Sequence, residues 1–374
     1  MCPARRTYVA IPPGVSPATA RAVPSRVASA TGPDGATFPG MRVLLLTHPD
    51  FVPPDESAAL SAREAFALKT EADVISTLRD LGHEVHVLGV QWELGPIPDA
   101  IDRLQPDIVF NLLEEFLGEP AFDHNVVGYL ELLRIPYTGC NPRGLMLARG
   151  KALAKKLLAY HRIAAPDFIV VPRGRTVRRP KGLDFPLIVK SLTADASLGI
   201  SKASVVDSDE RLAERVRFIH ERVGTDAIAE RFIEGRELYV SLLGDDRFVA
   251  FPPWELLAAH ARPLEPLIAT ERLKHDPVYQ ERKGVTIRPA RDVPPDVATR
   301  LLRDAKRIYR ILELSGYARL DFRLDAEGRA WFLEANPNPD IARSEEFAEA
   351  AAHAGIPYPE LLQRLLTLGL RRHR

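Results

Sequence analysis

The sequence predicts an α/β domain with a doubly wound sheet, followed by two α+β parts. Two observations support this prediction. From Met41 to about residue 142, apolar strands alternate with helices, which is typical of a parallel sheet covered on both faces. Further along the chain, short strands separated by turns are typical of α+β structure. The 374 residues, 46% of them hydrophobic and 27% charged, suffice for two or three domains with their own cores.

Composition and charge limit the function classes. Fifty basic and fifty acidic residues give a formal net charge of zero, so no overall field favours nucleic acid or an anionic membrane as a partner. Cys2 and Cys140 are too few for a disulfide framework or a zinc cluster, which fits a reducing cytoplasm. No apolar run approaches the roughly 20 residues of a membrane helix. We therefore expect a cytoplasmic protein without a membrane partner.

Residues 1–40 differ from the rest of the chain. They are rich in Ala, Pro, Ser and Arg and show no sustained apolar period, which predicts a disordered tail. The alternative is an amphipathic targeting peptide, against which the recurring prolines argue. Met41 opens a strand and is a second candidate for the start of translation.

The first domain is expected at 41–141. The run "VLLL" predicts a buried parallel strand, and a long helix should follow from about Glu56 to Gly82. "EVHVLGV" and "PDIVFNLL" predict two further strands, with a helix near 97–104 between them. The unit ends near "IPYTGCNP".

The next segments predict the two α+β parts. A long helix is expected over about 143–161, and it carries Lys151. The strands "FIVVPRG", "FPLIVKS", "AIAERFI" and "RELYVSLLGD" should follow, with one helix near 208–223. We place a central part at 142–243 and a C-terminal part at 244–374.

Two strands near the C-terminus predict a candidate metal site. "GYARLDFRL" and "RAWFLEANP" flank the turn "DAEG", which predicts a β-hairpin. With a two-residue loop at Ala326 and Glu327, Asp321 lies opposite Phe332, and strand periodicity puts four residues on one face: Arg319, Asp321, Glu334 and Asn336. Neighbouring carboxylates repel unless a cation lies between them, and Mg²⁺ takes one or two carboxylates plus substrate phosphates. The alternative is a solvated face that binds nothing.

Two further patterns suit a nucleotide. "PLIVKS" ends a strand on Lys190, and the small-residue loop that follows contains Gly199 and could hold phosphates through its backbone N–H groups. "AERFIEGREL" places Glu230 and Glu237 around an extended segment, and carboxylates are acceptors that suit an adenine amino group or a ribose diol. Each pattern alone is also compatible with charged strand ends in water.

The order of these groups resembles the ATP-grasp superfamily, and within it the D-alanine–D-alanine ligase branch. The resemblance runs from Met41 to about Leu366 and is most specific in "GCNPRGLMLARGKALAKKLL", "FIEGREL", "RLDF" and "FLEANPNP". It implies a Rossmann-like (pre-ATP-grasp) N-terminal domain followed by a two-part α+β ATP-grasp domain. It also implies ATP and two Mg²⁺ ions as cofactors, with Mn²⁺ as a substitute, and a homodimer formed through the N-terminal domain.

The resemblance further implies roles by position. Segments 191–200 and 252–284 would cover the site. Phosphates would be bound by Lys151, Lys190, Ser197 and Gly199; the adenine by Glu230, Arg231, Phe232 and Ile233; the ribose by Glu237; the metals by Asp321, Glu334 and Asn336; and Arg319 and Lys274 would serve catalysis, at the developing oxyanion and the phosphate.

Departures from the family concern the substrates. The family's glycine- and serine-rich opening, with its ammonium-binding glutamate, is absent, and His48 stands in the loop that replaces it. Glu114 and the glutamate after it replace a histidine–glycine pair. Asp340 and Glu345 stand where the family has an oxyanion-binding glycine and a carboxylate-binding serine. Because an acid repels a carboxylate, we expect a product other than D-alanyl-D-alanine.

Three functions remain open at this point. The first is an ATP- and Mg²⁺-dependent ligase that joins a small-molecule carboxylate to a small-molecule amine through an acylphosphate, with substrates other than two D-alanines. The second is D-alanine–D-alanine ligase of peptidoglycan synthesis. The third is a nucleotide-binding regulatory protein without ligase activity, against which the complete set of metal and phosphate residues argues.

Overall fold

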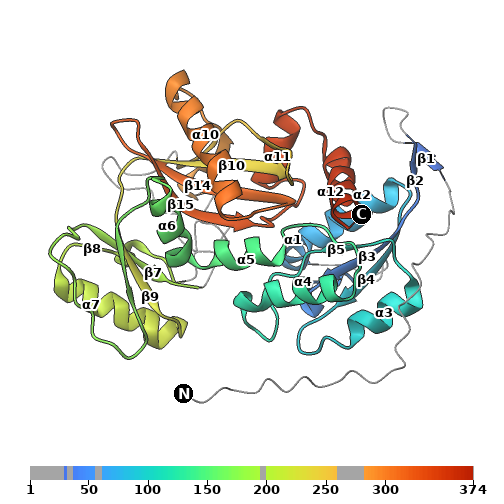
Figure 1. The fold of residues 1–374 in the computed structure, drawn as a ribbon, viewed down its shortest axis with the longest axis horizontal. Helices are drawn as coiled ribbons and strands as arrows, with labels where there is room; N and C mark the ends of the chain where they lie inside the picture. The colour runs from blue at the N-terminus through green and yellow to red at the C-terminus, as the bar shows by residue number, and fades with distance from the viewer. Residues whose placement is uncertain (1–28, 32–36, 55–60, 194–198, 259–281, 374) are drawn as a thin grey trace, which may run out of the picture.

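The structure is a computed structural model that describes residues 29–31, 37–54, 61–193, 199–258 and 282–373. Ser197, Lys274 and most of the expected covering segment 252–284 lie outside these ranges, as does the expected helix start at Glu56. Figure 1 shows three parts: an N-terminal domain around β3–β5, a central subdomain around β7–β9, and a C-terminal subdomain around β10, β14 and β15.

Two short strands pair within the segment that was predicted to be a tail. β1 (Ser29–Thr31) and β2 (Thr37–Pro39) form a two-stranded antiparallel sheet. The prediction of disorder therefore does not hold for these two strands.

The N-terminal domain contains the predicted parallel sheet with helices on both faces. Val43 and Leu45 pack in one core with α2 and α12, whereas Leu44 and Leu46 pack in another with α3 and α4. Val43–Thr47 of β3 and all of β5 are therefore buried, as expected when both faces are covered, whereas the edge strand β4 is fully buried only at Val85. The order is β4-β3-β5, and the elements are β3 (Arg42–Thr47), α2 (Lys69–Asp80), β4 (Glu84–Gly89), α3 (Pro96–Leu104), β5 (Ile108–Asn111), α4 (Asp123–Leu132) and α12 (Tyr358–Arg372).

Helix α12 is the last element of the chain, and it completes the first domain. It packs against α2 and β5, and Figure 1 shows it beside α2. Arg372, at its C-terminal end, donates to Gly139 O (2.9 Å) and to Asp245 Oδ1 (2.8 Å). The C-terminal helix therefore shares one core with α2 and the parallel sheet, a long-range contact that local sequence patterns do not indicate.

Two predicted long helices are each divided into two. α1 (Ala62–Ala67) and α2 meet at Leu68, and Gly82 ends α2 with a φ of +82° as predicted. α5 (Pro142–Arg149) and α6 (Lys151–Tyr160) meet at Gly150, whose ψ of 73° is not helical. The single helix predicted over 143–161 was therefore wrong, because glycine allows the chain to turn at that point. The break puts Lys151 at the first position of α6.

The central subdomain is a four-stranded antiparallel sheet covered on one face by a helix. The strand order is β6-β9-β7-β8, and α7 continues into a π-helical turn at Ile219–Val223 that ends at Gly224. Leu212, Val216 and Ile219 pack against the sheet. The elements are β6 (Phe168–Val171), β7 (Leu187–Ser191), β8 (Val205–Val206), α7 (Asp209–Phe218) and β9 (Ala227–Arg231).

The C-terminal subdomain is a six-stranded antiparallel sheet between two helices. Its main order is β13-β12-β10-β14-β15, with β11 paired to β10. Leu238 and Leu320 pack in the core that contains α10, whereas Tyr239 and Tyr317 pack in the one that contains α11. The elements are β10 (Arg236–Gly244), β11 (Phe248–Ala250), β12 (Trp254–Ala258), β13 (Val285–Pro289), α10 (Pro295–Ile311), β14 (Tyr317–Leu324), β15 (Ala330–Pro337) and α11 (Glu346–His353).

Strand pairing moves the predicted boundary between the two α+β parts. β10 pairs with β11, β12 and β14, so it belongs to the C-terminal sheet. The boundary therefore lies between β9 and β10, near residues 232–235, and the predicted boundary at 243/244 was too late. The pattern of short strands and turns is similar on both sides of β10, because both sheets are antiparallel, so the sequence does not mark the boundary.

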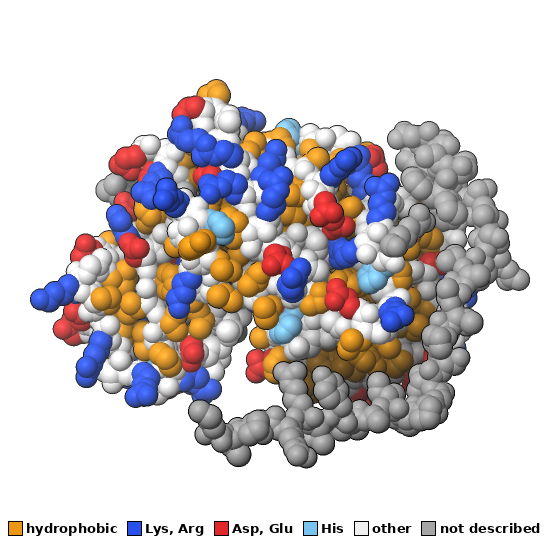
Figure 2. Space-filling view, in the orientation of Figure 1, with side chains coloured by type: hydrophobic (Ala, Val, Ile, Leu, Met, Phe, Trp, Pro, Cys, Tyr) orange, Lys and Arg blue, Asp and Glu red, His pale blue; other side chains and the backbone are white. Residues whose placement is uncertain are grey.

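The surface carries charges of both signs. Figure 2 shows basic and acidic side chains interspersed over one face of the molecule. This agrees with the formal net charge of zero. Across the described part of the chain, no helix combines the length and the apolar character needed to span a bilayer.

A close backbone junction joins the N-terminal domain to the hairpin of the C-terminal subdomain. Asn338 Oδ1 accepts from Cys140 N (2.7 Å), and Ser315 Oγ accepts from Asn141 N (2.9 Å). A Cβ on Gly316 would lie 2.5 Å from Gly139 O. The junction therefore needs glycine at position 316, because both the space and the φ of +69° exclude a side chain.

Gly316→Ala should destabilise the protein by about 1–3 kcal/mol, because the methyl group meets backbone and the left-handed conformation is strained. Gly174→Ala is the matched control, since Gly174 has a φ of +75° and nothing within 4 Å of its ideal Cβ. Denaturant unfolding of both variants separates the steric clash from the conformational strain. Equal destabilisation of the two would contradict the close junction.

Candidate active site

The register of the β14–β15 hairpin differs from the predicted one. Asp321 pairs with Glu334 and Arg319 pairs with Asn336, whereas Phe322 pairs with Phe332. Leu333 is therefore an extra residue, a β-bulge on β15. The predicted pairing of Asp321 with Phe332 was wrong, because the turn is longer than two residues and the bulge adds one more.

The bulge decides which way Glu334 faces. Phe332 packs on Phe322 in the core, with ring centroids 6.2 Å apart. In a regular strand, Glu334 would face the same way as Phe332, since side chains alternate with a period of two. The extra residue reverses this, and Glu334 shares a face with Asp321. The pairing thus confirms the predicted common face of four residues: Arg319, Asp321, Glu334 and Asn336. The strand register that produces this face differs from the predicted register.

Arg319 lies among acids on this face. Its Nε donates to Asp321 Oδ1 (2.7 Å) and its Nη2 to Asp321 Oδ2 (3.0 Å), while Nη1 forms an ion pair with Glu346. The guanidinium also lies over the ring of Tyr239, 4.7 Å from its centroid. Burial alone would lower the pKa of Arg319, but Asp321 outweighs it and holds the pKa above its ordinary value. Arg319 is a fixed positive charge beside the proposed metal ligands.

Glu230 lies between two lysines. Its Oε2 is 3.3 Å from Lys190 Nζ and its Oε1 is 3.5 Å from Lys155 Nζ. Burial alone would raise the pKa of Glu230, but the two ammonium groups outweigh it and hold the pKa below its ordinary value. Attraction by Glu230 and by Glu334 similarly outweighs the burial of Lys190 and raises its pKa. The proposed phosphate lysine is thus electrostatically coupled to the proposed metal ligand.

The other predicted nucleotide residues surround this group. Lys151 is buried at the start of α6, and Glu237 on β10 accepts from Arg323 Nη2 (2.7 Å) and Tyr239 Oη (2.9 Å). The backbone N–H groups of Arg231 and Phe232 donate to Asp167 O and Pro186 O, at 2.8 and 2.9 Å. These two N–H groups are therefore occupied within the protein.

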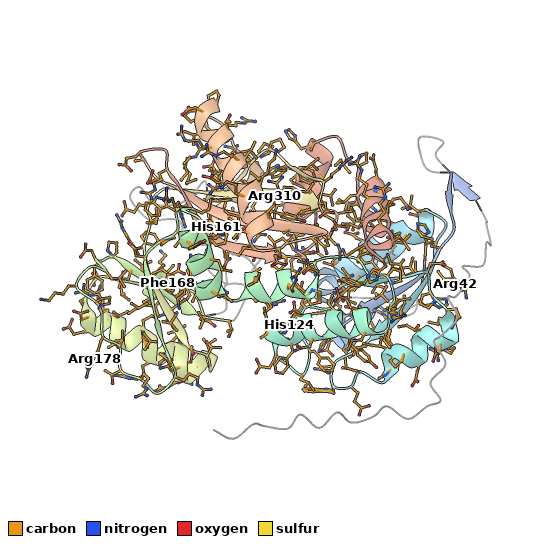
Figure 3. All side chains as sticks on the ribbon, viewed as in Figure 1. Arg42, His124, His161, Phe168, Arg178 and Arg310 are labelled. Atoms are coloured by element: carbon orange, nitrogen blue, oxygen red, sulfur yellow. The ribbon has the colours of Figure 1, made fainter. Side chains whose placement is uncertain are left out.

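Of the three residues whose backbone was predicted to contact the adenine, Ile233 is therefore the one whose N–H we propose as the donor to the base. Gly199 is described at the end of the predicted phosphate loop, with a φ of +70°. Phe168, labelled in Figure 3, pairs with Glu230 across β6 and β9, and His161, also labelled, follows α6.

The predicted substrate residues lie at the carboxyl edge of the parallel sheet and the loop facing it. Glu345 forms an ion pair with Lys69, and Asp340 accepts from Thr70 Oγ1 (2.8 Å). Burial, together with Glu114 and Asp340, raises the pKa of Tyr317, so both acids lie near that ring. His48, 9% exposed, accepts from Asp50 N through Nδ1 (3.2 Å). A role of these four residues in substrate binding stays a prediction.

Sequence reasoning missed two buried charged residues. Lys155 follows Lys151 by four residues, a spacing that puts both on one face of α6 and was available as a signal. Glu71, 5% exposed on α2, accepts from Thr47 Oγ1 (2.7 Å). Burial raises the pKa of Glu71, and Asp340 adds to the effect. No motif marked Glu71, because it lies within an ordinary helical pattern.

The donor set fits a Mg²⁺ ion that also binds phosphate. Among the described residues, no group of three or more His, Cys, Asp and Glu side chains is arranged to hold a metal by itself. Asp321 and Glu334 are opposite each other, and the amide of Asn336 has a buried Nδ2 without a hydrogen-bond partner in the described structure. Two carboxylates and an amide leave coordination positions for phosphate oxygens and water, as Mg²⁺ prefers.

Comparison with known proteins agrees with these features. A family model described as the D-ala D-ala ligase C-terminus matches residues 157–367. The uncharacterized protein y4sG of Sinorhizobium fredii is 31% identical over 313 residues, which cover 80% of this chain and 87% of that protein. A D-alanine–D-alanine ligase of Bordetella petrii is 34% identical over 258 residues, covering 68% of this chain and 73% of that protein.

A solved structure shows the same fold. The D-alanine–D-alanine ligase from Bacillus anthracis, complexed with ATP, superposes with a TM-score of 0.69 at 21% identity, covering 89% of this chain and 99% of that one. Fold, site and relatives together define an ATP-grasp ligase, an enzyme that forms carbon–nitrogen bonds. The chain belongs to the D-alanine–D-alanine ligase family, whose model matches more than half of its residues. This membership sets aside the regulatory alternative.

We propose Glu334 as a metal ligand, and Glu334→Gln should lower Mg²⁺-dependent turnover by more than about 100-fold, because a neutral amide binds the ion more weakly than a carboxylate. The unfolding midpoint should stay near that of the unmodified protein. Glu327→Gln, at the exposed turn of the same hairpin, is the control and should leave phosphate release unchanged. Full activity of Glu334→Gln would remove Glu334 from the metal site.

Proposed function

We propose that the protein is an ATP- and Mg²⁺-dependent carboxylate–amine ligase that acts through an acylphosphate. The observation that supports this most directly is the ion pair of Lys190 with Glu230, 3.3 Å between Nζ and Oε2, beside the hairpin face on which Asp321 and Glu334 are paired. Attraction by Glu230 and Glu334 keeps the pKa of Lys190 raised, so this buried group remains a cation suited to phosphate. The relatives named as D-alanine–D-alanine ligases support the same reaction class.

The reaction has two steps. An oxygen of the donor carboxylate attacks the γ-phosphorus of ATP, an O–P bond forms, the bond to the β–γ bridging oxygen breaks, and ADP leaves. The lone pair of the amine then attacks the acyl carbon, a C–N bond forms, the amine loses a proton, and phosphate departs with the C–O electrons. Phosphoryl transfer needs positioning and charge neutralisation more than covalent help from the protein.

The described residues can supply both the positioning and the charge neutralisation. Lys190 and Lys151 would bind the phosphates, and Asp321, Glu334 and Asn336 would hold two Mg²⁺ ions. When bound, the ions neutralise charge on the phosphate oxygens. Arg319 would stabilise the oxyanion of the second step. An arginine has five N–H donors, and its contacts with Asp321 and Glu346 use one on each nitrogen. Each terminal nitrogen therefore keeps a second donor.

For the substrates, we propose a pair other than two D-alanines. The acids at the substrate edge support this. Lys69 offsets the charge of Glu345, so the repulsion expected from that residue alone is smaller than the sequence suggested. Asp340 and Glu71 have hydroxyl partners instead, and burial together with the neighbouring Asp340 raises the pKa of Glu71. A neutral or cationic group of the acceptor amine would suit this edge.

D-alanine–D-alanine ligase is the second candidate, because relatives from several bacteria carry that name. One experiment distinguishes the two. The protein is incubated with ATP, Mg²⁺ and pairs from an amino-acid panel, and released phosphate is measured. We expect release with pairs whose acceptor is neutral or basic, and little with D-alanine alone. Activity confined to D-alanine would support the second candidate, and no activity with any pair would overturn the proposed ligase function.

A further inference from the structure

Lys155 is a buried cation to which neither the sequence motifs nor the proposed chemistry gives a role. It lies on α6 and is only 1% exposed. Removing an ammonium group from water costs several kcal/mol unless charge and hydrogen bonds replace the lost hydration. Burial, partly opposed by Glu230, lowers its pKa. The groups that contact this ammonium must therefore replace its lost hydration.

Those partners belong to two different subdomains. Lys155 Nζ is 3.5 Å from Glu230 Oε1, on β9 of the central sheet. The same nitrogen donates to Leu333 O at 2.8 Å and lies 3.4 Å from Phe332 O, both on β15 of the C-terminal sheet. It also lies 5.6 Å from the centroid of the Phe332 ring. One ammonium group thus joins the nucleotide-side carboxylate to the hairpin.

The contact on the hairpin is made at the bulge. β15 is an edge strand, so its outer backbone groups have no neighbouring strand to pair with. Phe332 N donates to Ala164 O (2.8 Å), and the carbonyl of Leu333, the extra residue, accepts from Lys155. A bulge leaves backbone groups unpaired, and a buried carbonyl without a donor is costly. Lys155 supplies that donor and stabilises the irregular register.

The register in turn controls Glu334. If Leu333 paired with Asp321 as a regular strand residue, Glu334 would face the core on the side of Phe332, and Asp321 would lack its opposite carboxylate. Whatever holds the bulge therefore holds the proposed metal site together. The backbone contacts that hold the bulge do not depend on the proposed function. Only the assignment of a metal ion as the ligand of Glu334 rests on it.

We propose that Lys155 is a positioning residue of the ligase: its ammonium clamps the β15 bulge at Leu333 and so presents Glu334 to the metal, and it ties this carboxylate to Glu230 on the nucleotide side. A structural role alone would change stability and leave the metal requirement as it is. A positioning role changes the affinity for the metal in the nucleotide complex even where the protein remains folded.

The test compares Lys155→Met with Lys156→Met. Both substitutions remove an ammonium group from adjacent positions of α6, but Lys156 is exposed. Metal binding is measured without turnover, by titrating Mn²⁺ into the ADP complex and following free Mn²⁺ by electron paramagnetic resonance. Lys155→Met should weaken Mn²⁺ binding by about 10–100-fold, the range typical of residues that orient metal ligands. Lys156→Met should bind as the unmodified protein does.

Lys155→Arg keeps the charge and a donor, and should recover part of the Mn²⁺ affinity. If Lys155→Met does not fold, Lys155→Arg decides, because its larger guanidinium displaces the donor from Leu333 O and should leave Mn²⁺ binding weaker than in the unmodified protein. Unchanged Mn²⁺ affinity in folded Lys155→Met, or in Lys155→Arg where only that variant folds, would overturn the proposal.

Failure of the inference and failure of the proposed function give different results. If the unmodified protein binds ADP and Mn²⁺ but releases no phosphate with any pair, the ligase proposal fails and the role of Lys155 is still measurable. If phosphate is released and Lys155→Met has normal Mn²⁺ affinity and normal magnesium dependence of turnover, the role of Lys155 fails and the ligase proposal stands.

Discussion

Buried charge is the constraint on which this site depends. Ions that leave water are tolerated only when opposite charges and hydrogen bonds replace the hydration, and three buried acids around the site have a basic neighbour at short distance. Asp321 has Arg319, Glu237 has Arg323, and Glu230 has two lysines. The Lys155–Glu230 pair ties α6 to the central sheet, and the hydrogen bond from the same ammonium to Leu333 O ties α6 to the C-terminal sheet. Lys155 therefore helps to fix the three relative to one another, which a core of apolar side chains would do with less directional precision.

Much of the fold could be predicted from the sequence, because local patterns determine local elements. The apolar runs at Val43–Leu46 and Ile108–Phe110 are buried parallel strands in the structure, and Gly82 ends its helix. Predictions that needed more than local pattern were less accurate. Gly150 breaks a helix that looks continuous in periodicity, and β10 belongs to the later sheet because of pairing partners far along the chain. Local sequence does not specify either choice.

In the candidate site, too, local patterns predicted some features, whereas others depend on long-range contacts. Side-chain periodicity brings Asp321 and Glu334 to one face in the predicted register and also in the observed one, although the two registers differ. The agreement has a physical basis: the longer turn alone would have put the two carboxylates on opposite faces, and the bulge at Leu333 restores them to one. A bulge has no reliable sequence signal when the extra residue is a leucine within an apolar strand. For Lys155 the only signal was its four-residue spacing from Lys151, because its contacts with Leu333 O and Phe332 O are to backbone carbonyls that leave no motif.

The identity of the substrates depends on contacts between domains. Lys69, Asp73 and Thr77 recur every four residues along one face of α2, and each contacts the loop between β15 and α11: Lys69 pairs with Glu345, while Asp73 and Thr77 accept from Arg343. The same loop leads into Glu346, which holds Arg319. A helix of the N-terminal domain thus sets the conformation of the segment that carries both the substrate-edge acids and the partner of the proposed oxyanion donor. If the proposed roles hold, changes on α2 would alter substrate selection without touching the proposed phosphate or metal residues, so the phosphoryl-transfer chemistry would be kept while the acceptor changes.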